Sequence, residues 1–474
     1  MPATAQITRF APSPTGALHL GNARTALFSW LAARASGGRF VLRVEDTDAG
    51  RSLDALLERQ LDELRWLGIT WDEGPGVGGP HGPYRQSERS SVYAEALAKL
   101  AANGQTYPCF CSPEELQLSR KTQLASGRPP RYARTCAGLS AVEVQRRIDS
   151  GKAPAIRFRV PDHRTVEFVD RVHGPQRFQS DDIGDFVIRR ADGSVSFFLG
   201  NAVDDSAMGI TLVLRGDDHL ANTPRQLLLL EALGMPLPEY GHLPLVLAPS
   251  GTPLSKREGA ASLTDLRGQG YLPAAIRNYL IRLGHACGND GWLALDQLAS
   301  HFDLTRTSHS AARFDEAQLR HWQREAVTHS TDAQIEQWLG GHLDALGVGE
   351  ERSAFVAVVK GNVLFPAEVD ELVAVVASNS VPVSADATAQ IIEAGPDFFT
   401  SAGSLLAANA GDFKGWTRAI AEATGRKGAK LFMPLRSALT GATHGPELAP
   451  LVGLMGAQRV LGRLDSARTL AARN

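Results

Sequence analysis

A histidine near the N-terminus, His19, could contact an anion together with Asn22. Both follow a short apolar segment and a proline-rich turn that contains Gly16, and residues with helical spacing begin near Gly21. A strand, a turn of small residues and a helix form a phosphate-binding arrangement, because free backbone N–H groups and the positive helix end face the turn. Alone, a His-x-Gly-x tetrapeptide is weak evidence and more often contains a structural histidine, so the phosphate interpretation needs support elsewhere in the chain.

Two charged side chains stand at the carboxyl ends of predicted strands, where open α/β sheets bind ligands. They are Glu45 and Arg215. Glu45, Asp46 and Asp48 could instead cap the following helix; we expect a ligand-binding role for Glu45 and capping by Asp46 or Asp48. Arg215 alone is typical of a surface group, and only its surroundings make it a candidate ligand for a carboxylate.

Three cysteines have the spacing of a zinc knuckle. Cys109 and Cys111 form a Cys-x-Cys pair, and Cys136 follows after 24 intervening residues. Thiolates on a tight turn suit tetrahedral zinc. No histidine follows Cys136 at close range in the sequence, which argues against a Cys₃His site, and a metal-free fold with buried thiols is the alternative.

The elements that must position these residues divide the chain into an α/β half and a helical half. Strand and helix alternate at the start, which predicts a Rossmann-type parallel sheet. A glycine- and proline-rich break at 74–82 separates it from an insertion, in which Ser112 and Glu115 form a capping box. From about residue 326 the pattern is helical. We expect strands at 7–10, 39–44, 185–190, 195–199 and 211–215, and helices at 21–35, 53–67 and 90–102.

Composition predicts a soluble globular protein of two to four domains. The chain has 474 residues, of which 43% are hydrophobic and 21% charged. No apolar run reaches ~18 residues, so we expect no membrane span. The N-terminus lacks a signal-peptide pattern, and four cysteines do not suggest a disulfide framework. A reducing cytoplasm fits these features.

The charge is unevenly distributed along the chain. The net charge is −2, yet residues 411–474 contain ten Lys and Arg against four Asp and Glu. A basic helical tail on an acidic body suits contact with RNA phosphates, although a solvated helix face would have the same composition.

Two separated segments carry a family resemblance. The stretch Arg9–Asn22 and the pentapeptide Pro253–Arg257 resemble the two signature sequences of class I aminoacyl-tRNA synthetases. The segments Arg43–Asp48, Gly82–Ser87 and Asn222–Gln226 are similar to those of bacterial-type glutamyl-tRNA synthetases. The resemblance extends over the whole chain.

This resemblance implies ATP-dependent ligation of L-glutamate to tRNA through a glutamyl-adenylate. It implies tRNA(Glu) as partner, and in some relatives tRNA(Gln) as well. Both steps crowd negative charge, so catalysis should rest on positioning and electrostatic stabilisation, with His19 and Lys256 as catalytic residues and Mg²⁺ bound with ATP. The implied ATP-binding residues are Gly16, His19, Gly21, Asn22, Ser255, Lys256 and Arg257.

The resemblance also implies how glutamate is recognised. Arg9 and Arg215 would pair with its side-chain carboxylate, and Glu45 with its α-ammonium. A neutral glutamine amide would leave desolvated charge unpaired. The implied glutamate-binding residues are Arg9, Ala11, Ser13, Glu45, Phe197, Asn201 and Arg215. In zinc-binding relatives a tyrosine four residues before the last cysteine can be the fourth ligand, which implies the set Cys109, Cys111, Tyr132 and Cys136.

Five segments follow from the resemblance, together with a monomeric state. They are the first half of a Rossmann-type catalytic domain at 1–75, an inserted α+β domain at 76–185 that contacts the tRNA acceptor end, the second catalytic half at 186–240, a stem-contact region with the Ser-Lys-Arg loop at 241–326, and an all-α anticodon-binding domain at 327–474.

Three positions depart from many relatives. Pro253 replaces a lysine, Phe197 replaces a tyrosine, and His219 stands where some relatives have tryptophan and others histidine. Other functions fit less well. A paralogue that glutamylates a modified tRNA base would lack the C-terminal third, a glutaminyl enzyme would have a β-rich anticodon part, and a small-molecule nucleotidylyltransferase would be far shorter. A catalytically silent tRNA-binding protein would be expected to have lost His19 or Lys256.

Overall fold

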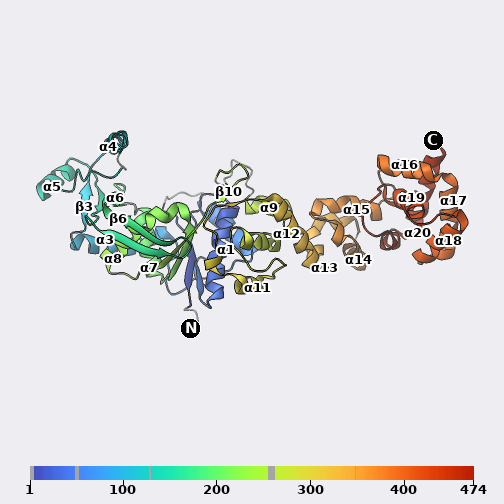
Figure 1. The fold of residues 1–474 in the computed structure, drawn as a ribbon, viewed down its shortest axis with the longest axis horizontal. Coiled ribbons are helices and arrows are strands. Elements are labelled where there is room, and N and C mark those ends of the chain that lie inside the picture. The colour runs from blue at the N-terminus through green and yellow to red at the C-terminus, as the bar shows by residue number, and fades with distance from the viewer. Residues whose placement is uncertain are drawn as a thin grey trace. The chain divides into compact units, whose positions relative to one another are not determined.

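The chain forms two compact units. The structure, a computed structural model, describes residues 5–47, 53–127, 130–252, 254, 262–346 and 349–473. The first unit consists of Met1–Arg267 with Ile276–Gln318, and the second of Gly268–Ala275 with Leu319–Asn474. In Figure 1 the first unit is coloured from blue to yellow and the second mainly from orange to red.

A six-stranded sheet lies at the centre of the first unit (Figure 1). In spatial order its strands are β2 (Arg39–Leu42), β1 (Ile7–Phe10), β8 (Leu212–Gly216), β9 (Glu239–Leu243), β5 (Thr165–Asp170) and β6 (Gly174–Gln179). Neighbours from β2 to β5 pair in parallel, and β6 is antiparallel to β5. This is the predicted Rossmann-type parallel sheet with an antiparallel hairpin at one edge.

Helices pack against this sheet and against each other. α1 (Leu20–Ala35) contacts β1, β2 and β8. Most of its residues are buried, which explains why it is apolar on nearly every side. α7 (Phe197–Ala207) packs against α3 (Ser90–Ala102) and α8 (Thr223–Leu233), while α2 (Leu53–Trp66) follows β2 in the chain.

A smaller antiparallel sheet lies within the predicted insertion and at its end. Its strands are, in order, β3 (Thr106–Cys109), β4 (Ala155–Phe158) and β7 (Phe186–Arg189). The helices α4 (Pro113–Ala125) and α5 (Ala141–Asp149) lie between β3 and β4 in the chain. The predicted capping box at the start of α4 is confirmed: Ser112 Oγ accepts from the Glu115 N–H, and the Ser112 N–H donates to Glu115 Oε2.

Two strand predictions for the large sheet are wrong. The strand at 186–189, β7, pairs with β4 in the smaller sheet. Residues 195–199 contain no strand, because Ser196 Oγ accepts the Leu199 N–H and caps α7. A short apolar run does not distinguish a buried strand from the first turn of a buried helix. The large sheet recruits β5 and β6 instead.

Further elements lie mostly in the first unit, and the last of them extends into the second. They are α6 (Ser180–Ile183), β10 (Val246–Leu247), α9 (Leu263–Gly268), α10 (Pro273–Arg282), α11 (Leu295–Leu298), β11 (Ala312–Arg313) and α12 (Glu316–His329). β10 and β11 form a separate parallel pair.

Helices build the second unit. Most of α12 belongs to this unit, and the helices that follow it are α13 (Asp332–Leu339), α14 (Glu350–Val359), α15 (Val369–Ala377), α16 (Ala385–Ala394), α17 (Pro396–Leu406), α18 (Phe413–Thr424), α19 (Ala429–Thr440) and α20 (Leu448–Ala472). Their core includes Phe355, Ile391, Trp416 and Leu451. The described part of this unit contains no strand, which confirms the predicted fold class of an α/β half followed by an all-α half. Among the described residues, no helix is long and apolar enough to cross a membrane.

Two glycines at helix ends make a matched stability test in the second unit. Gly425 and Gly441 end α18 and α19 in the left-handed conformation, with φ of +68° and +72°. A Cβ at Gly425 would meet none of the described residues within 4 Å, whereas one at Gly441 would lie 2.0 Å from the carbonyl oxygen of Pro382.

We therefore expect Gly425→Ala to lower the free energy of unfolding by about 1–2 kcal/mol, the cost of placing a Cβ in this backbone conformation. Gly441→Ala should lower it by about 1–3 kcal/mol more, because the Cβ overlaps a backbone atom. Urea unfolding monitored by circular dichroism measures both, and equal effects of the two substitutions would contradict the prediction.

Candidate active site

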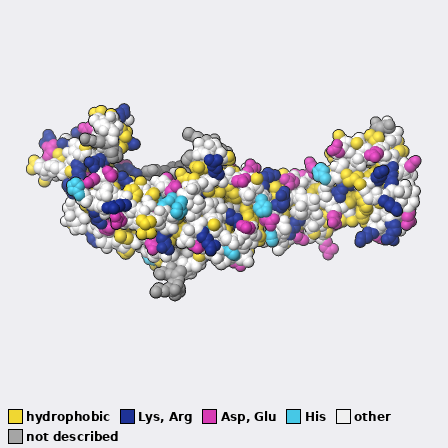
Figure 2. All heavy atoms as spheres, in the orientation of Figure 1, with side chains coloured by type: hydrophobic (Ala, Val, Ile, Leu, Met, Phe, Trp, Pro, Cys, Tyr) yellow, Lys and Arg dark blue, Asp and Glu magenta, His cyan; other side chains and the backbone are white. Residues whose placement is uncertain are grey.

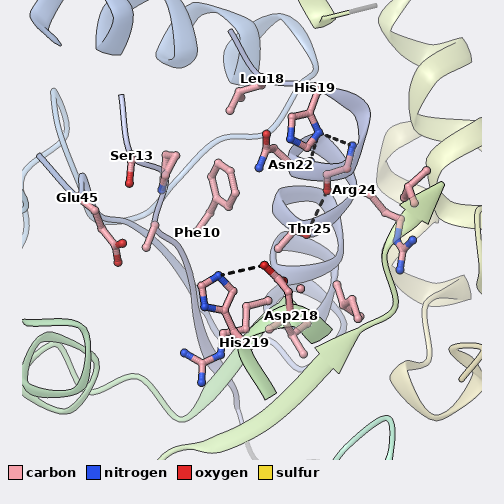
Figure 3. A pocket seen from close by; sticks show the side chains of 18 of the residues that line it. Phe10, Ser13, Leu18, His19, Asn22, Arg24, Thr25, Glu45, Asp218 and His219 are labelled. Atoms are coloured by element: carbon pink, nitrogen blue, oxygen red, sulfur yellow. Dashed lines mark hydrogen bonds and ion pairs between the residues drawn. The ribbon is translucent and has the colours of Figure 1, made fainter. Parts of the chain in front are cut away.

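A cavity of about 660 Å³ opens where β1 and β8 end and α1 begins. Figure 3 shows Ser13 and Glu45 on one side of it and His19 with Asn22 on the other. The residues predicted to form the site and found in its lining are Arg9, Ala11, Ser13, Gly16, His19, Gly21, Asn22, Glu45, Phe197, Asn201 and Arg215. Segments nearly two hundred residues apart in the chain therefore meet at one edge of the sheet, as predicted for strand ends.

Some predicted residues cannot be placed in this pocket. Ser255, Lys256 and Arg257 lie outside the described residues, as does Asp48. Leu254, which precedes them directly, lines the pocket. Asp46 was expected to cap a helix, but its carboxylate accepts from the backbone N–H and the hydroxyl of Ser87, each at 2.9 Å.

His19 caps helix α1 with its own ring. Nδ1 accepts from the backbone N–H groups of Gly21 and Asn22, at 3.1 and 3.3 Å (Figure 3). A neutral imidazole that accepts at Nδ1 has its proton on Nε2. Two backbone N–H groups that were expected to be free are therefore bonded to His19. Because they polarise the imidazole, its Nε2–H becomes a stronger hydrogen-bond donor at the positive end of the helix.

The turn before His19 is held from α2. Gln60 Nε2 donates to the carbonyl oxygens of Ser13 and Gly16, at 3.2 and 2.7 Å, and Glu63 Oε2 accepts from the Leu18 N–H at 2.8 Å. These bonds satisfy polar backbone groups that a buried turn would otherwise leave unpaired. Side chains some 45 residues away in the sequence thus set the shape of the turn.

A buried carboxylate of α7 pairs with two arginines, one in β1 and one directly after β2. Asp205 Oδ1 accepts from Arg9 Nε at 3.0 Å and from Arg43 Nη1 at 2.6 Å. Burial raises the pKa of Asp205, but Arg43 and Arg9 outweigh this effect and hold the pKa below its ordinary value. Arg43 also reaches Glu45 Oε1 at 3.4 Å, and Asn201 Nδ2 donates to the same oxygen.

The preceding acid, Asp204, anchors a second set of groups. Its carboxylate accepts from Arg89 Nε at 2.6 Å, from Gln86 Nε2 at 2.9 Å and from the hydroxyl of Tyr93 at 2.8 Å. Arg43 Nε lies 3.8 Å from it. The two adjacent aspartates therefore hold α3 and both arginine-bearing strands against α7.

Arg215 differs from Arg9, Arg43 and Arg89 because its side-chain partners among the described residues are neutral. Its Nε donates to His242 Nε2 at 3.1 Å and its Nη2 to Thr223 Oγ1 at 2.8 Å. Nη1 is buried and has no hydrogen-bond partner among the described residues. No carboxylate pairs with Arg215 among the residues that the structure describes. Burial lowers the pKa of Arg215 to about 10, which leaves the group charged near neutral pH.

An aromatic pair lines the pocket near Arg215. The rings of Phe197 and His219 have centroids 5.4 Å apart and are inclined by 34°. His219 Nδ1 lies 3.2 Å from the side-chain nitrogen of Asn222, and its other ring nitrogen lies 3.8 Å from Asp218 (Figure 3).

Sequence reasoning missed several residues that support this pocket. They are Arg43, Gln60, Glu63, Asp204, Asp205, His242, Asp170 and Thr223. A signal existed for Asp204 and Asp205, because adjacent acids in an otherwise apolar helix are buried only when they are paired. A similar signal existed for Arg43, which stands between apolar strand residues. The partners themselves are distant in sequence and could not be identified.

The predicted metal ligands also come together. The Sγ atoms of Cys109, Cys111 and Cys136 lie within 4.8 Å of one another, with 3.7 Å between the last two. The Tyr132 hydroxyl lies 3.4 Å from Cys109 Sγ and 3.5 Å from Cys111 Sγ. Tetrahedral zinc with Zn–S of about 2.3 Å and Zn–O of about 2.0 Å requires about 3.8 Å between sulfurs and about 3.5 Å between sulfur and oxygen. The donor set fits zinc in type and spacing.

Comparison with known proteins matches both halves of the chain to protein families. A family model described as "tRNA synthetases class I (E and Q), catalytic domain" matches residues 6–321. A second, described as "Anticodon binding domain", matches residues 333–468. The two matches adjoin near the boundary between the compact units.

Full-length relatives and a solved structure agree with these matches. Glutamate–tRNA ligase 1 of Halorhodospira halophila is 53% identical and glutamate–tRNA ligase 2 of Acidithiobacillus ferrooxidans 51%; the alignments cover 98% and 97% of this chain and 97% and 95% of the relatives. The crystal structure of a glutamate tRNA ligase from Elizabethkingia meningosepticum, in complex with its amino acid, superposes with a TM-score of 0.89 at 28% identity, covering 98% of this chain and 99% of that one. The chain belongs to the class I tRNA synthetases and, within them, to the glutamate–tRNA ligases.

Proposed function

We propose that this chain activates L-glutamate with ATP and transfers it to tRNA(Glu), using the pocket of about 660 Å³ as its catalytic site. One observation carries the proposal. The same pocket contains the capped end of α1 at His19, the acid Glu45, and Arg215 with an unpaired, buried Nη1. These are the groups needed for phosphates, an ammonium and a carboxylate.

In the first step an oxygen of the glutamate α-carboxylate bonds to the α-phosphorus of ATP, and the bond to the β-phosphate oxygen breaks to release pyrophosphate. His19 Nε2–H donates to a phosphate oxygen, and Lys256 neutralises the leaving pyrophosphate. Mg²⁺ bound with ATP would share that charge. In the second step a terminal ribose hydroxyl of the tRNA attacks the glutamyl carbonyl and AMP leaves.

Arg215 and Glu45 orient the amino acid in this proposal. The γ-carboxylate bonds to the Nη1 end of Arg215 and the α-ammonium to Glu45, which Asn201 holds in place. Arg9 contributes positive charge beside them, while its Nε and Nη2 are bonded to Asp205.

The helical unit contacts the anticodon part of tRNA in this proposal. Lys414, Arg418, Lys427 and Lys430 are exposed on α18, on α19 and between them. Figure 2 shows Lys and Arg side chains gathered on the same end of the chain. Phosphates bind such basic surfaces largely through charge. The inserted segment at 76–185 is proposed to contact the acceptor end.

The direct test is charging of purified tRNA(Glu) and tRNA(Gln) transcripts with labelled glutamate. We expect tRNA(Glu) to be labelled, and His19→Ala to lower kcat about a hundredfold, because one preorganised donor to the phosphates is lost. His301→Ala, a histidine of the same unit outside the pocket, is the matched control. Labelling of tRNA(Gln) as well would extend the substrate range to a route with later amidation. If neither transcript is labelled, the proposed function is wrong.

The site also predicts how glutamate binding depends on pH. Burial raises the pKa of Glu45 above its ordinary value, with Arg43 and Arg9 opposing the rise. Only the ionised carboxylate pairs with an ammonium, so KM for glutamate should increase as pH falls through this pKa, beginning above the ordinary glutamate value of about 4.3.

Glu45→Gln should raise KM for glutamate about tenfold or more at pH 7 and remove this pH dependence, because a neutral amide has no proton to gain. Pyrophosphate exchange in the presence of tRNA, measured from pH 5 to 8 with KM for ATP as internal reference, tests it. Glu58→Gln, an exposed acid outside the pocket, should behave like the unchanged protein. An unaltered KM in Glu45→Gln would refute the assignment.

Zinc is the third part of the proposal. Cys109, Cys111, Tyr132 and Cys136 would hold one ion, which would fix the loop after β3 and supply structure, not chemistry. The protein purified from zinc-supplemented cells should contain about one zinc per chain.

After dialysis against a chelator, Cys111→Ala should have lost the metal and Tyr132→Phe should retain less than the unchanged protein, as measured by inductively coupled plasma mass spectrometry. Cys287→Ala, a buried cysteine outside the cluster, should retain it fully. Metal-free unchanged protein would show that the thiols are simply buried.

A further inference from the structure

A buried chain of hydrogen bonds links Asp170 to Arg215 through His242. Asp170 Oδ2 lies 2.6 Å from His242 Nδ1, and His242 Nε2 lies 3.1 Å from Arg215 Nε. Asp170, His242 and Arg215 are 2%, 0% and 6% exposed. They come from β5, β9 and β8, which are adjacent strands of the large sheet.

The surroundings of Asp170 determine the protonation of the imidazole. The other oxygen, Oδ1, accepts the backbone N–H groups of Val172 and His173 at 2.9 and 2.8 Å and of His242 at 3.3 Å. Burial raises the pKa of Asp170, but these bonds and the one from His242 outweigh it and lower the pKa. An ionised carboxylate can only accept, so Nδ1 of His242 is the donor.

His242 is then neutral, with a lone pair on Nε2. Burial lowers its pKa, which favours the neutral ring. Two donors approach that lone pair, Arg215 Nε at 3.1 Å and the hydroxyl of Thr223 at 3.0 Å. A proton on Nε2 would face the guanidinium directly, so the bond to Asp170 is what keeps Nε2 an acceptor.

The arrangement fixes the guanidinium without neutralising it. Nε and Nη2 of Arg215 are occupied by His242 and Thr223, and the buried Nη1 is left for a ligand in the pocket that Arg215 lines. A carboxylate bonded directly to Arg215 would hold it equally well but would cancel the charge that a substrate carboxylate has to meet. In this chain of hydrogen bonds the carboxylate, Asp170, is separated from Arg215 by the imidazole ring of His242.

We propose that His242 and Asp170 are positioning residues that set the preference for a carboxylate over an amide on the amino-acid side chain. They do so by holding Arg215 charged and planar, with its buried Nη1 left without a partner among the described residues. This inference rests on the proposed role of Arg215 in binding glutamate. It predicts that the two residues affect amino-acid selection far more than ATP binding.

The test compares variants that keep or lose one atom of the chain. His242→Asn retains a donor toward Asp170 but removes the acceptor facing Arg215, whereas His242→Gln places an amide oxygen near the position of Nε2. Asp170→Asn allows the ring to move its proton to Nε2. Pyrophosphate exchange in the presence of tRNA gives KM for glutamate, KM for ATP and Ki for glutamine as a competitor.

We expect His242→Asn and Asp170→Asn to raise KM for glutamate about tenfold, the usual effect of losing a hydrogen bond to a charged group. The ratio of Ki for glutamine to KM for glutamate should fall, and KM for ATP should stay within about twofold. His242→Gln should keep both KM for glutamate and the ratio of Ki for glutamine to KM for glutamate close to those of the unchanged protein. His285→Asn is the control, because His285 is equally buried but contacts the carbonyl oxygens of Ile281 and Asp303.

Arg215→Gln distinguishes the role of Arg215 in binding glutamate from the positioning role of His242 and Asp170. If it leaves KM for glutamate unchanged, the proposed role of Arg215 is wrong and this inference falls with it. If it raises KM while His242→Asn and Asp170→Asn leave the glutamine ratio unchanged, only the positioning role is overturned. An equal shift of that ratio in His285→Asn would likewise overturn it, since lost stability would then explain the effect.

Discussion

The carboxylate of Asp205 determines where the charged groups of the pocket lie. Its two bonds, to Arg9 and Arg43, join β1 and β2 to α7. Removing one partner from a buried ion pair costs about 3–5 kcal/mol, because the other charge remains desolvated and uncompensated. The position of Glu45 also depends on Asp205, because Arg43 bonds to both carboxylates. The positions of the charged groups in the pocket are therefore set by buried ion pairs inside the fold.

This pairing is incomplete at two buried arginines that line the pocket, Arg24 and Arg215; among the described residues neither has a carboxylate partner. Arg9, Arg43 and Arg89 each have a carboxylate partner, whereas the side chains that bond to Arg215 among the described residues are neutral. The lowered pKa of Arg215 reflects the cost of burying this charge. A ligand carboxylate recovers that cost on binding, and a neutral amide of the same shape does not. Selectivity then follows from desolvation, and it requires that the protein does not neutralise the group itself.

Local features were predictable from the sequence, and long-range pairings were not. β1, the extent of α3 and the cap at Ser112 follow from neighbouring residues. The meeting of Glu45 with Arg215 follows from the strand-end rule for parallel sheets. By contrast, Asp170 and His242 are 72 residues apart and neither belongs to a motif. The failed strand at 195–199 has a local cause, because one capping hydroxyl decides between two structures that an apolar run permits equally.

The departure at Phe197 can be weighed against this charge pattern. Its ring packs on His219 and Phe198 and takes no part in the network around Arg215. A tyrosine hydroxyl there would add at most one neutral hydrogen bond, worth about 0.5–1.5 kcal/mol, against about 1.5–3 kcal/mol for a bond to a charged group. The missing hydroxyl can therefore shift affinity for the amino acid by several-fold. The choice between acid and amide depends on Arg215, whose partners are unaffected by which ring stands at position 197.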